Sequence, residues 1–193
     1  LGALVLMTGG YGSMDAGLPA FMTVVAGLPV NAIGIVFFVN TLLIVVLQVW
    51  VLKRIEGRSR TWMLAITAVL WAAFWAVVAV SSGFTPWVAG VLITVGFGVF
   101  AFGEMIFSPV APSLINAFAP PHLRGRYNAV GGLVWSVSGS LGPIIAGVMI
   151  GSGWGIAWAL LLAVGALVAG LILSSLRGLI TAEEDGREPA AAV

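Results

Sequence analysis

Long apolar runs separated by short polar segments dominate the chain. A transmembrane helix needs about 20 mostly apolar residues, and charged or turn-forming residues separate one span from the next. This criterion predicts six membrane spans, at residues 1–26, 32–52, 61–81, 87–107 or longer, 127–150 and 156–176. The pattern therefore predicts an all-α, polytopic membrane protein.

The C-terminal end of the chain is polar, unlike these runs. We expect residues 1–176 to form one six-helix transmembrane bundle and residues 177–193, RGLITAEEDGREPAAAV, to form a short disordered tail. At the other end, the sequence opens inside an apolar run, LGALVLMTGG, without the basic segment of a secretory signal. We therefore expect the chain to be a fragment of a longer polypeptide.

Composition excludes several classes of protein. Hydrophobic residues make up 61% of the chain and charged residues 8%, whereas an ordinary soluble domain has about 25% charged residues. A soluble globule is therefore excluded. The net charge of +1 leaves no basic stripe that could follow the phosphates of a nucleic acid. Since the chain has no cysteine and a single histidine, His122, we expect no metal site and no cofactor.

The basic residues predict the orientation, because Lys and Arg are retained on the cytoplasmic side during insertion. With six spans, all eight of them fall on one face: Lys53, Arg54, Arg58, Arg60, Arg124, Arg126, Arg177 and Arg187. Both ends of this chain are therefore predicted to be cytoplasmic, in a cytoplasmic membrane.

Two acidic residues, Asp15 and Glu104, lie inside predicted spans, whereas the other five lie in polar segments of the cytoplasmic face. An ionised carboxylate at the centre of a bilayer costs at least about 2.5 kcal/mol, so such residues face protein or water and often mark proton or substrate pathways. The two residues are thus candidates for proton coupling or substrate binding. The alternative is that each one only bonds a neighbouring helix or faces a vestibule.

The positions of the two acids are related. If the six helices form two inverted three-helix repeats, the first helix corresponds to the fourth, and each of these carries one acid. Asp15 is followed by Pro19 and Glu104 by Pro109, so each helix is expected to bend or break about one turn beyond its carboxylate.

Other candidates accompany the two acids. The polar residues Tyr11, Ser13 and Asn40 are candidates for lining a cavity, although each could instead make a single interhelical hydrogen bond. Small residues repeat at four-residue spacing in the fifth span. This spacing fits either tight helix packing or a hinge at Gly142 and Pro143.

Two segments resemble the C-terminal six-helix half of the major facilitator superfamily. QVWVLKRIEGRSR is similar to the basic loop between the family's eighth and ninth helices, with Gly57, Arg58 and Arg60 in its glycine-arginine portion. It departs from the full motif at Trp50 and Arg54, where the motif has glycine and aspartate. The stretch GEMIFSPVAPSLINAFAPPHLRGRYNAVGGLVWSVSGSLGPIIAG is similar to the tenth and eleventh helices of bacterial drug-exporter-like members.

The resemblance implies alternating access, in which two six-helix bundles rock about a midplane site and protonation of buried carboxylates drives transport. It places Asp15 and Glu104 in the central cavity and implies an N-terminal six-helix half that is missing from this chain. It also implies a cytoplasmic gate at the loops, which would contact acidic helix ends or membrane lipids and contain Gly57, Arg58, Arg60, Arg124, Gly125 and Arg126. The alternative for these loops is anchoring alone.

The first functional hypothesis is therefore proton-coupled efflux of hydrophobic or cationic small molecules. Import of a sugar or another nutrient with protons is the alternative within transport. A six-helix membrane component that transports nothing is the alternative outside it. A membrane enzyme is the least supported class, because the sequence has no constellation of nucleophile and base and no metal-binding cluster.

Overall fold

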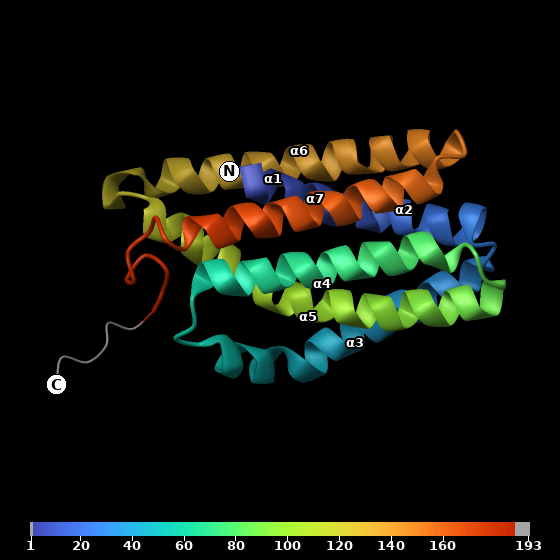
Figure 1. Ribbon diagram of the computed structural model, residues 1–193, viewed down its shortest axis with the longest axis horizontal. Coiled ribbons are helices and arrows are strands. Elements are labelled where there is room, and N and C mark those ends of the chain that lie inside the picture. The colour runs from blue at the N-terminus through green and yellow to red at the C-terminus, as the bar shows by residue number, and fades with distance from the viewer. Residues whose placement is uncertain (1, 188–193) are drawn as a thin grey trace.

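The computed structural model describes residues 2–187, and within this range the chain is helical with no strand (Figure 1). The elements are α1 (Gly2–Gly12), α2 (Met14–Ala20), the π-helix η1 (Phe21–Val25), α3 (Val30–Ile55), α4 (Arg60–Ser81), α5 (Pro86–Phe118), the 3-10 helix η2 (Pro121–Leu123), α6 (Arg124–Gly151) and α7 (Gly155–Leu176). The all-α expectation is confirmed for these residues.

Five helices, α3 to α7, are long and apolar enough to cross a membrane. The first expected span, residues 1–26, is instead segmented into α1, α2 and η1, with a turn at Ser13. Residue 1 lies outside the described residues. Pro19 lies inside α2, and a proline cannot donate the helical hydrogen bond at its own position. The π-helix that begins two residues later shows where the regular ladder is lost. The chain is thus a polytopic helical membrane protein with five continuous spans and one segmented stretch.

The helices pack in a definite order. α4 lies against α7 and α5, α3 lies against α5, and α1 lies against α6 and α7. The interior is filled by large aromatic side chains that are almost completely buried, namely Trp71, Trp75, Trp158, Phe21, Phe74, Phe97 and Phe100. Since lipid tails are as apolar as these side chains, it is close packing rather than exclusion of water that holds such helices together.

The segmented stretch approaches α6 very closely. At Gly142, an added Cβ would lie 2.7 Å from the backbone carbon of Gly12, and at Gly12 it would lie 2.5 Å from the carbonyl oxygen of Ser138. The hydroxyl groups of Thr8 and Ser138 lie 2.9 Å apart and form a buried hydrogen bond beside this contact. Only residues without a side chain permit two helix backbones to come this near.

Prolines do not interrupt the other two helices. α6 runs from Arg124 to Gly151 through Pro143, and α5 runs from Pro86 to Phe118 through Pro109 and Pro112. Of the bend or break expected beyond Glu104, the break is therefore absent from α5. The hinge expected at Gly142 and Pro143 coincides with the close contact to α1 and not with an interruption of the helix.

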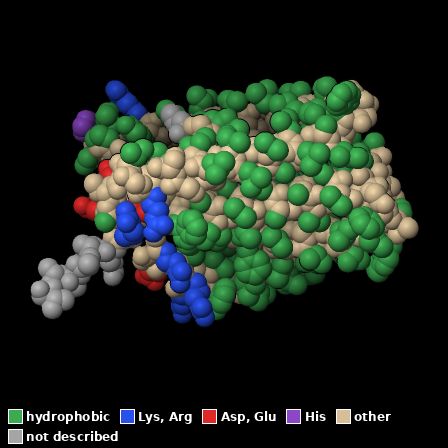
Figure 2. Space-filling model, viewed as in Figure 1, with side chains coloured by type: hydrophobic (Ala, Val, Ile, Leu, Met, Phe, Trp, Pro, Cys, Tyr) green, Lys and Arg blue, Asp and Glu red, His purple; other side chains and the backbone are tan. Residues whose placement is uncertain are grey.

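Charge is concentrated at one end of the bundle, which we call the basic end. The basic residues lie in the α3–α4 turn, around the start of α6 and after α7, and Figure 2 shows the blue side chains gathered there. The connections at the opposite end, residues 26–29, 82–85 and 152–154, contain no charged residue. The α3–α4 turn depends on Gly57, whose φ of +69° lies in the left-handed region that favours glycine.

Part of the tail is folded against the basic end. Residues 181–187 form a turn that contacts the start of α4, whereas the sequence composition led us to expect disorder. The hydrogen bonds described below account for the difference, since a buried carboxylate fixes this segment. Residues 188–193 of the expected tail lie outside the described residues.

Candidate functional site

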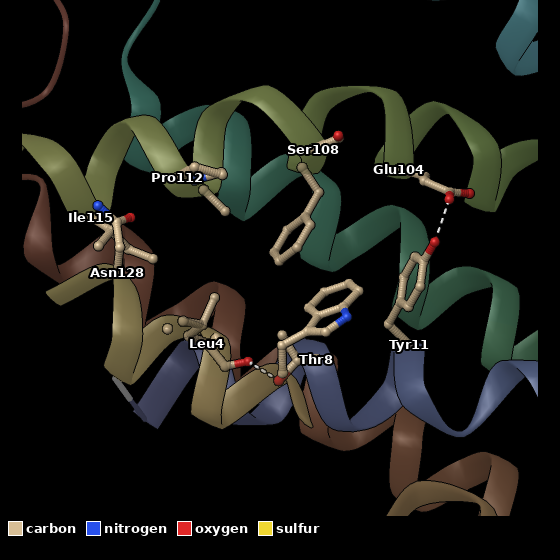
Figure 3. A pocket seen from close by; sticks show the side chains of 13 residues that line it. Leu4, Thr8, Tyr11, Glu104, Ser108, Pro112, Ile115 and Asn128 are labelled. Carbon is tan, nitrogen blue, oxygen red and sulfur yellow. Dashed lines mark hydrogen bonds between the residues drawn. The ribbon is translucent and has the colours of Figure 1, made fainter. Parts of the chain in front are cut away.

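A cavity of about 370 Å³ lies between α1, α5 and α6. Its walls are mostly apolar, with Leu4, Phe107, Ala111, Pro112, Ile115 and Trp135 among them, and its polar side chains are Thr8, Tyr11, Glu104, Ser108 and Asn128. Figure 3 shows Tyr11 and Glu104 at one end of this space and Asn128 at the other. An apolar pocket with a few polar groups is typical of small-molecule sites.

Glu104 is the acidic residue of the cavity. The hydroxyl of Tyr11 donates to its Oε1 across 2.5 Å, joining α1 to α5 (Figure 3). The second oxygen, Oε2, is buried and has no hydrogen-bond partner among the described residues. Oε1 is thus held by a hydrogen bond from the protein, whereas Oε2 is free to accept one. Such a group can take up a proton or bind a cationic group of a ligand.

Aromatic side chains position the phenol of Tyr11. Its ring centroid lies 4.9 Å from that of Trp135 on α6 and 5.8 Å from that of Trp71 on α4. Trp71 in turn stacks on Phe100 of α5, with centroids 4.8 Å apart. The Tyr11 hydroxyl is therefore aimed at Glu104 by side chains from three helices.

The stretch of α5 around Glu104 receives side-chain hydrogen bonds from two other helices. Asn40 of α3 donates to the Phe97 carbonyl oxygen across 3.4 Å, and Trp71 of α4 donates to that of Phe100 across 3.2 Å. The remaining two bonds run from the Thr67 hydroxyl to the Gly103 carbonyl and from the Gln48 amide to the Met105 carbonyl, at 3.3 Å each. The carbonyls on both sides of Glu104 are thus fixed from outside the helix.

The Gln48 contact has a local cause in the sequence. Pro109 has no N–H group, so the carbonyl oxygen of Met105, four residues earlier, loses its helical donor. The side chain of Gln48 donates to that oxygen instead. Because a buried carbonyl without a donor is costly in lipid, this replacement explains how α5 continues through a proline.

Asp15 lies in a different environment. It is in the first turn of the short helix α2, its side chain is exposed, and within the described residues it makes no side-chain hydrogen bond or ion pair. It is not among the residues that line the cavity. The structure therefore does not bring the two intramembrane acids together in one hydrogen-bonded group.

The remaining candidates fall in three places. Tyr11 lines the cavity, Ser13 is buried at the turn between α1 and α2, and Asn40 is buried against α5 outside the cavity lining. The loop candidates lie at the basic end. Arg60 contacts the folded tail, Arg58 is exposed, and Gly125 lies between the exposed Arg124 and Arg126 in the first turn of α6.

Sequence reasoning missed several cavity residues. Thr8 comes three residues before Tyr11, and Ser108 comes four residues after Glu104, so each lies on the same helix face as a candidate residue. Helical spacing could therefore have found them. Asn128 and Trp135 of α6 could not be placed in this way, since nothing in the sequence shows which face of α6 meets α1 and α5.

Comparisons with known proteins give one relative. The chain is 36% identical over 107 residues to the "Uncharacterized MFS-type transporter YhjO" of Bacillus subtilis (strain 168). The aligned residues make up 55% of this chain but only 25% of that protein, so the match spans about a quarter of the relative's length. No family model matches the chain, and no solved structure matches it. The chain is thus similar to part of a protein whose name describes an MFS-type transporter.

Proposed function

We propose that this chain is the C-terminal six-helix half of a major facilitator superfamily transporter that exports hydrophobic or cationic small molecules in exchange for protons. The observation that carries the proposal is the half-satisfied carboxylate of Glu104 inside an apolar cavity. The similarity to an MFS-type transporter supports the family, and the absence of a basic side chain in the cavity lining favours a cationic ligand.

The order of helix packing supports two inverted three-helix repeats. The extensive contacts are α4 with α7, α4 with α5, α1 with α7, α3 with α5 and α1 with α6. If α1 is exchanged with α5, α3 with α6 and α4 with α7, each of these contacts either stays the same or becomes another contact of the same set. For this comparison, the segmented stretch of α1, α2 and η1 counts as the first helix of the first repeat.

The least buried spanning helices support a missing N-terminal half. α3 and α6 bury the smallest share of their spans. Their exposed apolar side chains include Ile35, Phe38, Val45, Val46, Leu133, Val137, Leu141 and Ile144. We propose that a second bundle covers part of this surface and that membrane lipids cover the rest. Asp15 fits the same arrangement, because an exposed carboxylate at membrane depth must face another protein segment or water.

In this mechanism the cavity opens alternately to the two sides of the membrane. Oε2 of Glu104 takes up a proton while the cavity is open to the outer side and releases it to the cytoplasm when the cavity opens there. The ionised carboxylate then binds the cationic ligand in the proton's place, while the Tyr11 hydroxyl keeps Oε1 in place. The concentration of basic residues at one end supports a cytoplasmic location for that end and hence a bacterial cytoplasmic membrane with both termini of this chain inside.

The test uses the full-length protein in inverted membrane vesicles with an imposed proton gradient and ethidium as the cationic probe. We expect gradient-driven accumulation of ethidium, and we expect Glu104→Gln to reduce it at least tenfold. The matched control is Glu56→Gln in the exposed α3–α4 turn, which should transport like the unmodified protein. Unchanged transport by Glu104→Gln would contradict the proposed role. Uptake into right-side-out vesicles only would instead indicate a symporter, and no transport of any probe would indicate a non-transporting component.

A further inference from the structure

Residues 181–187 form a turn, which we call the strap, that is not accounted for by the proposed transport site. The strap is stabilised internally. The Thr181 hydroxyl and backbone N–H both donate to Oε2 of Glu184 across 2.9 Å, and the Glu184 N–H donates back to the Thr181 hydroxyl across 3.2 Å. This reciprocal pattern is the capping box of a helical turn. The strap thus has a defined local conformation.

Asp185 anchors the strap to the start of α4. Its side chain is completely buried. Oδ2 accepts from the Ser59 hydroxyl across 2.6 Å, and Oδ1 accepts from the backbone N–H and the hydroxyl of Thr61, both across 2.9 Å. The guanidinium of Arg187 forms an ion pair with Oδ2 across 3.1 Å. A residue more than 120 positions downstream in the chain therefore helps to cap α4, in addition to the N-cap residue Ser59.

These contacts keep Asp185 charged. Burial by itself raises the pKa of an aspartate, but the hydrogen bonds from Ser59 and Thr61 and the charge of Arg187 together lower the pKa of Asp185 below its ordinary value. The positive end of the α4 dipole favours the same negative charge. At neutral pH the anchor is therefore an ionised carboxylate that accepts hydrogen bonds from Ser59 and Thr61 and is paired with Arg187.

Arg60 holds the backbone of the strap. Its N–H donates to the Asp185 carbonyl oxygen across 2.7 Å, and its guanidinium donates to the carbonyl oxygens of Glu184 and Glu183 across 2.8 and 3.4 Å. The strap is thus fixed by its side chain at Asp185 and by three consecutive carbonyl groups.

The strap lines a second pocket, which lies next to the cavity. Together with Arg60, its residues Glu183 and Glu184 form one wall of a polar vestibule of about 600 Å³ at the basic end. Asn116 of α5 and Asn128 of α6 form the opposite wall, joined by a hydrogen bond of 2.8 Å. Asn128 also lines the cavity that contains Glu104. The vestibule and the cavity therefore share this residue as part of their walls.

We propose that the strap, fixed to α4 by Asp185, is a cytoplasmic latch that restricts access to the Glu104 cavity from the basic end. The anchoring itself is independent of the proposed transport function. The restriction of access rests on the proposed transport function only for its physiological role. Both the anchoring of the strap and the restriction of access can be measured without a transport assay.

Amide hydrogen exchange tests the anchor in the full-length protein in nanodiscs. The first N–H groups of a helix have no acceptor within the helix, so protection at Arg60 and Thr61 depends on the strap. Replacing Asp185→Asn should speed exchange of a peptide covering these amides at least fivefold. A chain that ends at Leu179 should do the same. The control Glu183→Gln removes an exposed charge from the same strap and should leave the exchange unchanged. Unaltered exchange in both the Asp185→Asn and the truncated protein would overturn the anchor.

Cysteine labelling tests the latch. The chain has no cysteine, so a Ser108→Cys substitution provides a unique reporter on the cavity wall within it. A membrane-impermeant maleimide, added to inverted vesicles, should label this cysteine several-fold faster when Asp185→Asn is also present, and at the original rate with Glu183→Gln. Faster amide exchange without faster labelling would show an anchored strap that does not restrict access, and it would overturn the latch. Loss of ethidium transport in Glu104→Gln bears on neither measurement.

Discussion

The two regions that carry the intramembrane acids have the same sequence signature and different structures. In each, a carboxylate precedes a proline by four or five residues. Around Glu104, α5 remains one helix of 33 residues with two prolines inside it. Around Asp15, a turn residue at Ser13 separates α1 from α2, and a π-helix follows Pro19.

The two stretches also differ in the hydrogen bonds that they receive from neighbouring helices. Four side chains of α3 and α4 donate to carbonyl groups of α5 between Phe97 and Met105, and one of them supplies the donor that Pro109 lacks. In the α1–α2–η1 stretch, the described side-chain donors to backbone carbonyls, Thr8 and Thr23, belong to the stretch itself. At Pro109 a neighbouring helix thus replaces the lost hydrogen bond, whereas among the described residues no side chain of a neighbouring helix donates to a carbonyl of the α1–α2–η1 stretch.

The two regions also differ in how they are held. The α5 region is held by directed hydrogen bonds, whereas the α1–α2 region is held by direct contact of glycine backbones with α6. Three predictions test this comparison.

The largest effect should separate the two acids themselves. Among the described residues that line the cavity, Glu104 is the one carboxylate, so in Glu104→Gln ethidium transport by the full-length protein should fall at least tenfold. Asp15→Asn changes an exposed residue outside the cavity lining, so its transport should fall by less than about threefold, a difference below about 0.7 kcal/mol of transition-state free energy. Equal losses in the two variants, measured at equal protein amounts in vesicles, would show that the acids act as one group.

The next effect concerns the glycine contact. In Gly142→Ala, the new Cβ would lie 2.7 Å from backbone atoms of Gly12 and Ser13, so α1 and α6 must separate. We expect a loss of about 1–3 kcal/mol in the free energy of unfolding, typical of overpacking. The matched control is Gly139→Ala in the same helix, where an added Cβ meets no atom within 4 Å. Unfolding by a denaturing detergent measures both. Similar losses in the two variants would contradict the role of the backbone contact, because helix propensity by itself favours Ala over Gly at both positions.

The smallest effect concerns the replaced hydrogen bond of α5. Gln48→Leu leaves the Met105 carbonyl without a donor and should cost about 0.6–1.7 kcal/mol, the range measured for interhelical hydrogen bonds in membranes. Thr41→Val, at an exposed position of the same helix, is the control.

A double-mutant cycle makes this prediction specific. In Pro109→Ala the residue at position 109 regains an N–H group that can donate to Met105. Gln48→Leu should therefore cost less in that background than in the unmodified protein. An identical cost in both backgrounds would contradict the assignment of Gln48 as the substitute donor for the proline.

Much of the fold was predictable because lipid imposes simple constraints on sequence. The apolar runs at residues 32–52, 61–81, 127–150 and 156–176 lie within α3, α4, α6 and α7. The gathering of the basic residues at one end likewise follows from the positions of these eight residues in the sequence. The proline after Asp15 predicted an irregularity in residues 1–26, and a π-helix follows it, but the same signal after Glu104 did not interrupt α5.

The sequence by itself determined which residues can carry charge inside the membrane, since a carboxylate in an apolar run is visible without any structure. Only the tertiary structure decided that Glu104 shares a cavity with Tyr11, Thr8 and Asn128 while Asp15 lies exposed outside it. It also decided that Asp185, one of many charges in a polar tail, is buried at the start of α4. The physical reason is the same in each case. Composition sets the cost of burying a charge, and only the arrangement of distant helices supplies the donors that offset it.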